Sequence, residues 1–408
     1  MTATSDADAV RNSYRAKEGQ IVTLMALGFG LVGIDRFLIT PLFPVIAKDL
    51  GLSYGDIGTI SGALALAWGA AALLMGNLSD RIGRRKVIVG SLICFALLIG
   101  ASGLATGLGG LVLVRIVMGL ADGAYTPPSI SATLEASPPK RHGLNIGIQQ
   151  MMLPLCGLGI APILVGELLH VIDWRWIFLV FSLPGLILAY LVWRVLPAHS
   201  APDLERNSLS DWRAVLGYRN IRILMVLMLC WLTCLITTSA LMPSYLIDHL
   251  RLSQSQMGWV MSAIGLGSTV GTLVLPTLSD RVGRKPVMLF SILGVAFSLW
   301  QLTAIGAEPL QLFLWLALVH CFNNAAITLT VGPICSETVP PALMSTATGV
   351  VIACGELFGG GIAPMIAGRM ADMYGIAHLL WLPLATTVLA FVLCLFLIET
   401  RWSADHGE

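Results

Sequence analysis

The segment LSDRIGRRKV at residues 78–87 decides the fold, because it returns as LSDRVGRKPV at 278–287 with seven of its ten residues unchanged. A second matching pair is GIAPILVG at 159–166 and GIAPMIAG at 361–368. Further residues match at the same spacing of about 200, namely Leu50, Leu52, Ser53, Gly58 and Glu135 with Leu250, Leu252, Ser253, Gly258 and Glu337. The chain therefore contains an internal repeat, with one sequence unit present in two copies.

Each unit is too apolar for a water-soluble domain. The 408 residues are 56% hydrophobic and 12% charged, whereas soluble domains are about one quarter charged. A helix needs roughly 20 apolar residues to cross a bilayer, and only helices satisfy such a segment's own backbone groups in lipid. The sequence therefore predicts an all-α membrane protein with twelve spans, over residues 21–46, 57–78, 87–106, 108–131, 144–169, 176–196, 221–247, 257–277, 287–306, 310–333, 343–367 and 378–398.

Positive charge is distributed unevenly along the chain. With the N-terminus placed inside, the inner segments carry eighteen of the 24 Lys and Arg residues, and the outer loops carry four. Such residues concentrate on the cytoplasmic side, so we expect both termini there and a multi-pass protein of the cell membrane. The first span is too long for the core of a cleaved signal peptide. The predicted divisions are a cytoplasmic tail, a six-helix bundle, a cytoplasmic loop, a second six-helix bundle and a cytoplasmic tail, at residues 1–20, 21–196, 197–220, 221–398 and 399–408.

Three motifs make the sequence resemble the major facilitator superfamily of transporters. GNLSDRIGRRK at 76–86 resembles the signature loop between helices 2 and 3 of that family. RIVMGLADG at 115–123 resembles its helix 4 motif, and DWRWIF at 173–178 is typical of the start of helix 6. The resemblance extends over residues 20–400. It implies two pseudo-symmetric bundles of six transmembrane helices that rock around a substrate site between them, giving alternating access.

The resemblance also implies a gating role for the signature loop and its copy. In the family this loop is a cytoplasmic latch, in which the acidic residue pairs with a neighbouring helix end while the arginines help to hold it. An alternative is that the positive charges only set topology, but this does not explain Asp80 or Gly83. The predicted gating residues are Gly76, Asp80, Arg81, Gly83, Arg84 and Arg85, with Asp280, Arg281, Gly283 and Arg284 in the copy.

Four charged residues lie inside the predicted spans. Asp35 and Arg36 are adjacent in the first span, and Arg115 and Asp122 are two turns apart on one face of helix 4. A charge at the bilayer centre costs roughly 2.5–3.5 kcal/mol on insertion scales, so such residues normally face a bundle interior or a water-filled cavity. One interpretation is that the four form structural ion pairs. Two acids and two arginines on helices that line the family's cavity favour a functional site.

The functional interpretation gives each charged residue a role. Arginine presents a planar fork that matches a carboxylate and keeps its proton, so Arg36 is predicted to bind a substrate anion. Arg115 is either a second substrate-binding residue or a structural one. Asp35 and Asp122 are the predicted proton carriers, because burial and a nearby arginine shift the pKa of a carboxylate in opposite directions. Glu356, in span 11, is the third proton-coupling candidate.

A finer resemblance points to the anion:cation symporter branch, which includes proton-coupled carriers of organic anions. It rests on the neighbours Asp35 and Arg36 and on Arg115 followed by an acid at the seventh residue. Here that acid is Asp122, where the branch more often has Glu. The aromatic-acid symporter branch has Asp-Gly-x-Asp on helix 1, which GIDRF at 33–37 lacks.

Other polar residues inside the spans complete the predicted site. We expect amides in lipid to be satisfied by substrate or protein, because an unpaired amide is costly there. The predicted substrate-binding residues are Tyr125, Gln149, Gln150, His320, Asn323 and Asn324, besides Arg36 and Arg115. We expect no cofactor, no metal and no nucleic acid partner. The expected partners are a small organic anion, protons and the lipid bilayer, and the expected state is a monomer.

Three alternatives remain open at this stage. A proton-coupled drug or metabolite exporter often carries Gly-Pro-x-x-Gly-Gly on helix 5, and here Ala161 precedes Pro162 while Gly166 follows. An organic anion exchanger has less need of two central aspartates. A membrane enzyme or sensor is disfavoured, because no Gly-x-Ser-x-Gly or phosphate-loop motif is present. Span 7 holds no arginine, which favours a monocarboxylate over a dicarboxylate.

Overall fold

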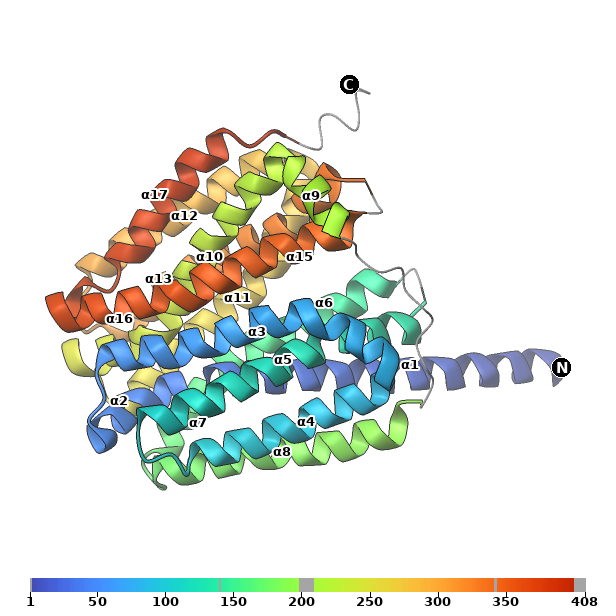
Figure 1. Cartoon of the computed structure of the whole chain (residues 1–408), viewed down its shortest axis with the longest axis horizontal. Helices are drawn as coiled ribbons and strands as arrows, with labels where there is room; N and C mark the ends of the chain where they lie inside the picture. The colour runs from blue at the N-terminus through green and yellow to red at the C-terminus, as the bar shows by residue number, and fades with distance from the viewer. Residues whose placement is uncertain (1, 139–140, 198–208, 341–342, 400–408) are drawn as a thin grey trace.

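The structure, a computed structural model, describes residues 2–138, 141–197, 209–340 and 343–399. Side chains are described from residue 17 onward, apart from those at 72–82, 209–211 and 345. The described residues form helices and no strand (Figure 1). The helices before residue 197, called the first half, are α1 Thr2–Phe37, α2 Ile39–Leu50, α3 Tyr54–Ile82, α4 Arg84–Ser102, α5 Leu108–Ala136, α6 His142–Pro154, η2 Leu155–Ile160, α7 Ala161–Leu168 and α8 Trp174–Val195.

The helices after residue 208 are called the second half. They are α9 Leu209–Gly217, α10 Arg219–Ser244, η3 Tyr245–His249, α11 Gln254–Val282, α12 Arg284–Ala304, α13 Pro309–Val331, α14 Pro333–Thr338, α15 Met344–Cys354, η5 Gly355–Ile362, α16 Ala363–Tyr374, η6 Ile376–His378 and α17 Trp381–Leu395. Most lie along one common direction, with the start of α1 and the close of α17 toward the same end (Figure 1). We call that end the terminal end. The opposite end holds the close of α2, α7 and α16.

Eleven helical stretches are long and apolar enough to cross a membrane, which makes the chain a multi-pass membrane protein. The expected span at 57–78 lies in α3, which is not among the eleven. Because the side chains of α3 are described only up to residue 71, this twelfth span stays a prediction. The stretches Lys17–Leu50 and Arg219–His249 have the largest share of residues buried inside the protein, and Ile376–Leu395 has the smallest.

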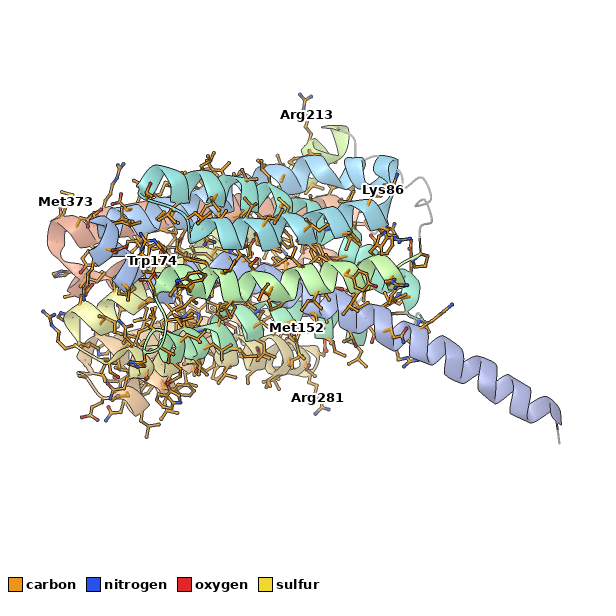
Figure 2. The ribbon with its side chains drawn as sticks, turned by 90° about the horizontal axis from the view of Figure 1, so that it is seen from below. Lys86, Met152, Trp174, Arg213, Arg281 and Met373 are labelled. Atoms are coloured by element: carbon orange, nitrogen blue, oxygen red, sulfur yellow. The ribbon has the colours of Figure 1, made fainter. Side chains whose placement is uncertain are left out.

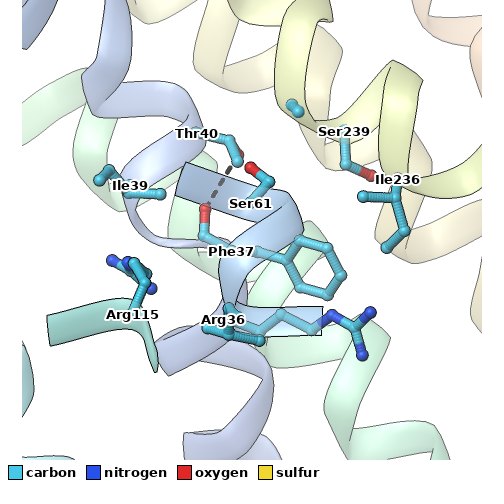
Figure 3. Close-up of a pocket in the computed structure, with 10 residues that line it drawn as sticks. Arg36, Phe37, Ile39, Thr40, Ser61, Arg115, Ile236 and Ser239 are labelled. Atoms are coloured by element: carbon cyan, nitrogen blue, oxygen red, sulfur yellow. Dashed lines mark hydrogen bonds between the residues drawn. The ribbon is translucent and has the colours of Figure 1, made fainter. Parts of the chain in front are cut away.

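The first span is bent beside its two charged residues. Helix α1 ends at Phe37, Leu38 forms a turn, and α2 continues from Ile39. Pro41 has no N–H to donate to the carbonyl of Phe37 one turn earlier, and such a proline bends a helix. The hydroxyl of Thr40 donates to that carbonyl instead, at 2.9 Å (Figure 3). The bend therefore follows directly after Asp35 and Arg36.

The halves meet closely at the opposite end through the repeated motifs. A Cβ on Gly58 of α3 would lie 2.2 Å from the carbonyl oxygen of Pro364. A Cβ on Gly258 of α11 would lie 2.4 Å from the carbonyl oxygen of Pro162. Gly58 and Gly258 match in the repeat, as do the two prolines. The duplicated sequence therefore builds two equivalent helix crossings, each possible because glycine lets two backbones approach.

The helices that supply these prolines are locally unwound. The π-helical segments η2 and η5 interrupt the fifth and eleventh spans at matching places, just before Pro162 and Pro364. Such π-bulges are frequently found at functional sites and bend the helix that contains them. In the second half, η5 also carries Glu356, so the unwound segment brings this acid to the centre.

Candidate functional site

An ion pair joins the two halves at the middle of the molecule. The guanidinium of Arg36 donates to both carboxylate oxygens of Glu356, at 2.8 and 3.2 Å. The two side chains are 9% and 10% exposed. Among the ion pairs of the described side chains, this one links the first half to the second. Two parallel bonds between an arginine and a carboxylate are the geometry that gives strong and specific anion binding.

The surroundings of this ion pair are aromatic and tight. The centre of the guanidinium of Arg36 lies 4.5 Å from the ring centroid of Trp68 and 5.5 Å from that of Phe37. Rings at such distances stabilise a cation, most strongly where water is excluded. A Cβ on Gly360 would lie only 2.7 Å from a carboxylate oxygen of Glu356. The glycine one turn after Glu356 therefore leaves the space that the ion pair fills.

Behind the ion pair, the structure brings two buried acids together. Asp35 of α1 and Asp122 of α5 are 0% exposed, and their carboxyl groups lie within hydrogen-bonding reach of each other. No protein N–H or O–H donor of the described residues bonds to any of their four carboxylate oxygens. Two carboxylates in contact repel unless a proton lies between them. The pair is therefore built to hold one proton.

Arg115 connects this acid pair to the bend of the first span. Its Nη1 donates to the backbone oxygen of Asp35, while Nε and Nη2 have no partner in the described part of the chain. Its positive charge acts on both Asp35 and Asp122, and the charge of Arg36 also acts on Asp122. Arg115 with one shared proton on the two acids is formally neutral. The predicted charged residues thus form two neighbouring clusters.

A small cavity lies next to both arginines. Its volume is about 10 Å³, which is about the space needed for one water molecule. Figure 3 shows Arg36 extending to one side of α1 while Arg115 lies on the other. An organic anion needs more room, so the halves must separate before one can reach Arg36. The lining residues are Arg36, Phe37, Ile39, Thr40, Ser61, Leu64, Arg115, Ile236, Ser239 and Ala240.

The other polar residues predicted in the first half make no hydrogen bond to the ion pair among the described contacts. Tyr125 is buried, and its hydroxyl donates to the carbonyl of Met25 at 3.4 Å. Gln149 is also buried and accepts a hydrogen bond from Thr133 at 2.6 Å. Gln150 is exposed. Their predicted contacts with substrate stay predictions, and in this conformation the first two hold helices of the first half together.

The polar residues predicted in the second half lie on α13. His320 is buried and lies 3.1 Å from the hydroxyl of Thr238 through Nε2. Asn323 donates to the backbone oxygen of Trp231 at 3.2 Å, and Asn324 is half-buried. Nδ1 of His320 and Oδ1 of Asn323 have no partner in the part of the chain that the structure describes. Their binding role also stays a prediction.

The predicted gating loops hold equivalent ion pairs at the terminal end. Arg84 pairs with Glu135 in the first half, and Arg284 pairs with Glu337 at 2.7 Å in the second. The two acids match in the repeat. Asp280 also pairs with Arg284, at 2.6 Å. Each of these bonds lies within one half, so they tie the loops to their own bundle.

The remaining residues of these loops differ in surroundings. Gly83 and Gly283 have φ of 99° and 111°, a conformation that side chains other than glycine rarely adopt. Arg85 donates to the backbone oxygen of Trp193, and Arg281 is exposed and points away from the helices (Figure 2). The side chains predicted at Gly76, Asp80 and Arg81 lie outside the described part. The latch itself stays a prediction.

Sequence reasoning missed the polar contacts between the halves at the opposite end. The backbone N–H groups of Tyr54 and Gly55 each donate to the carboxylate of Asp372, at 2.8 Å. The hydroxyl of Tyr54 also donates to Asp248 at 3.1 Å. Asp372 therefore caps the start of α3 from the other half. Nothing in the sequence distinguishes this aspartate from an ordinary acid at a helix end.

Comparisons with known proteins identify the family of the chain. The sequence profile of the Major Facilitator Superfamily matches residues 25–253 and 237–407. The chain is 27% identical to a 3-(3-hydroxy-phenyl)propionate transporter of Escherichia coli over 80% of each chain. It is 26% identical to a multi-drug resistance efflux pump homolog of Lactococcus lactis, over 87% of this chain and 92% of that one. The crystal structure of a bacterial homolog of the human lysosomal transporter Spinster superposes with a TM-score of 0.77 at 17% identity, covering 94% and 97% of the two chains.

Proposed function

Since the chain belongs to the Major Facilitator Superfamily and is a transporter rather than an enzyme, we propose that it carries a small organic acid anion into the cell together with protons. The observation that carries the proposal is the position of Arg36. Its guanidinium lies where the two halves meet, and it already binds a carboxylate with two hydrogen bonds. Directly behind it lie the two contacting acids.

Arg36 binds the anion in this proposal. The carboxylate of Glu356 stands where the carboxylate of a substrate would lie, and it uses both arms of the guanidinium. Arginine keeps its charge at all physiological pH values, so its affinity for an anion does not depend on its own titration. A cationic drug would be repelled by Arg36 and Arg115, which disfavours the common exporter substrates.

Asp35, Asp122 and Glu356 are the proton-coupling acids in this proposal. The carboxyl groups of Asp35 and Asp122 lie within hydrogen-bonding reach of each other, and the charge of Arg36 acts on Asp122. Glu356 already offsets the charge of Arg36, so a bound anion adds one negative charge to this buried centre and makes a second negative charge on its acids less favourable. Anion binding at Arg36 therefore favours uptake of a proton by the buried acids of this centre, and this is the physical link between the two cargoes.

Two six-helix bundles rock around this centre in the proposed cycle, with both termini in the cytoplasm. The glycine crossings and the cap by Asp372 close the opposite end, which would face outward. The name of the relative from Escherichia coli contains a propionate, which agrees with a carboxylate as cargo. The relative from Lactococcus lactis is an efflux pump homolog, so export of an anion is the second candidate.

Proton flux into liposomes tests the proposal. Purified protein is reconstituted with a pH-sensitive dye, and a panel of organic acids is added outside, including benzoate, lactate and 3-phenylpropionate. We expect one or more acids to move protons inward through the wild type, and neither Asp122→Asn nor Arg36→Ala to do so. If lipophilic cations move protons and no acid does, the exporter alternative replaces this function and Arg36 is structural.

A further inference from the structure

We propose that Glu356 is an internal substitute for the substrate carboxylate, which occupies Arg36 when the carrier is empty and releases it when an anion binds. This inference rests on the proposed function. It assigns to Glu356 the step that separates a symporter from an exchanger, namely the return of the empty carrier. The starting observation is the two-bond contact with Arg36, made across the boundary between the halves.

The contact closes the substrate position completely. Both carboxylate oxygens of Glu356 accept from Arg36, Trp68 covers the guanidinium, and the adjacent cavity has room for about one water molecule. A substrate carboxylate therefore cannot bind Arg36 beside Glu356. It has to replace Glu356 on the same two N–H groups, which is a one-for-one exchange of carboxylates.

Charge balance then fixes what Glu356 does after it is displaced. In the empty carrier, Arg36 and Glu356 sum to zero, as do Arg115 and the two acids with one shared proton. When an anion takes Arg36, an ionised Glu356 would remain buried without a counter-charge, which is strongly unfavourable. Glu356 therefore takes one proton from the side on which the anion entered. The proton leaves on the other side when the anion leaves and the ion pair forms again.

The surroundings of Glu356 support this role. Arg36 is the charged group that faces it among the described contacts, and Asp122 lies beyond Arg36. The helices packed on η5 present apolar groups near Glu356, with Gly69 of α3 and Met228 of α10 bordering this segment. An unpaired charge would thus find no second partner in the described part. Without Glu356, the empty carrier would have to switch with Arg36 unpaired.

Glutamine at position 356 separates the two halves of the cycle, because it resembles protonated glutamate and cannot form an ion pair. We expect Glu356→Gln to keep exchange of labelled for unlabelled carboxylate within about threefold of the wild type. Net uptake driven by a pH gradient should fall by at least about tenfold, since the empty return is blocked. The probe is whichever of radiolabelled benzoate, lactate or 3-phenylpropionate the wild type transports.

The pH dependence of binding gives a second, independent readout. Because binding takes up a proton at Glu356, the affinity of the wild type should fall as pH rises, by up to tenfold per pH unit. This slope should decrease by one proton in Glu356→Gln, which should bind the carboxylate more tightly than the wild type at pH 8. Glu356→Asp keeps a titrating group on a shorter arm and should retain the slope.

Glu167→Gln is the matched control, because it makes the same chemical change at an exposed position of α7. It should leave exchange, net uptake and the pH slope unchanged. The inference is overturned if folded Glu356→Gln retains net uptake, or if it loses carboxylate binding and exchange together. In either case the proposed function stands as long as the wild type couples an acid to protons. If the wild type transports no acid, the proposed function fails first and this inference fails with it.

Discussion

The two copies of the repeat make equivalent contacts at the opposite end of the molecule, but they supply different residues at its centre. At the opposite end, Gly58 meets Pro364 and Gly258 meets Pro162, so matching residues make matching contacts. At the centre, the first half supplies Asp35 and Arg36, while Leu235 and Ile236 stand 200 residues later. The duplicated elements thus keep the shape of the two helix crossings, and the charged residues lie where the copies have diverged. A two-fold scaffold holds an asymmetric site.

The helix starts of α3 and α11, which match in the repeat, also differ in how their backbone N–H groups are capped. In α11, Ser253 and Gln256 cap the helix from its own sequence, through bonds of 3.0 and 3.2 Å. In α3, the N–H groups at Tyr54 and Gly55 are satisfied by Asp372 of the second half. The start of α11 is therefore capped without the other half. The start of α3 is fully capped only when the two halves are closed at this end.

The largest effect on net uptake is expected from placing a larger side chain at a glycine of either helix crossing. Gly58→Val and Gly258→Val each place a side chain against a backbone carbonyl that cannot move aside, and overpacking of about 3 kcal/mol corresponds to roughly a hundredfold shift against the closed form. We expect net uptake to fall accordingly in both variants, with folding retained on size-exclusion chromatography. Gly90→Val is the control, because a Cβ at Gly90 meets nothing within 4 Å. Unequal losses at the two crossings would break their proposed equivalence.

A tenfold effect is expected from changing the shape of the central cation. Arg36→Lys keeps the charge but removes the fork, and one charge-assisted hydrogen bond is worth about 1.5 kcal/mol or roughly a factor of ten. The affinity for the transported carboxylate should fall by that factor at constant pH. Arg213→Lys, on the exposed face of α9 (Figure 2), should bind as the wild type does. An unchanged affinity in Arg36→Lys would remove Arg36 from the anion site.

A smaller effect is expected from crowding Glu356 without altering its charge. In Gly360→Ala the new methyl lies 2.7 Å from a carboxylate oxygen, which has to move away from Arg36. A cost of about 1 kcal/mol predicts that net uptake falls about fivefold while exchange changes less. Gly349→Ala in α15 has open space around it and serves as the control. Equal loss of exchange and net uptake would indicate general misfolding of η5 instead.

The smallest effect is expected at the cap across the halves. Asp372→Asn keeps one acceptor but loses the negative charge at the start of α3, a change of about 0.5 kcal/mol, or roughly twofold. Hydrogen exchange at the amides of Tyr54 and Gly55 should speed up by that factor. Ser253→Ala is the comparison, and its effect should stay within the second half. No change at Tyr54 in Asp372→Asn would show that the cap does not hold the halves together.

Much of the fold follows from the sequence, because long apolar segments satisfy their backbone groups in a bilayer as helices. Apolar length predicts the helices, and the matching segments predict two related halves. The family predicted from its motifs is confirmed by the profile that covers most of the chain. The interruption at Leu38 was not predicted, because residues 21–46 form one continuous apolar segment, although Pro41 lies four residues after Phe37.

The pairing inside the site could not be predicted, because it depends on which faces of distant helices oppose each other. Arg36 and Glu356 are 320 residues apart, and nothing local links them. The sequence predicts Asp35 and Asp122 as proton carriers, but their closeness follows from the crossing of α1 with α5. The cap by Asp372 forms between halves and leaves no trace in either local sequence.

Accumulation of a labelled carboxylate against its gradient tests the central claim most directly. Liposomes holding the wild-type protein are given equal concentrations of the transported acid on both sides, with the exterior made one pH unit more acidic. The account predicts that the anion accumulates inside, that a protonophore abolishes the accumulation, and that Arg36→Ala and Asp122→Asn abolish it too. If the anion remains at equal concentrations, or accumulates outside, its movement is not coupled to inward proton flow at this centre, and the account is contradicted.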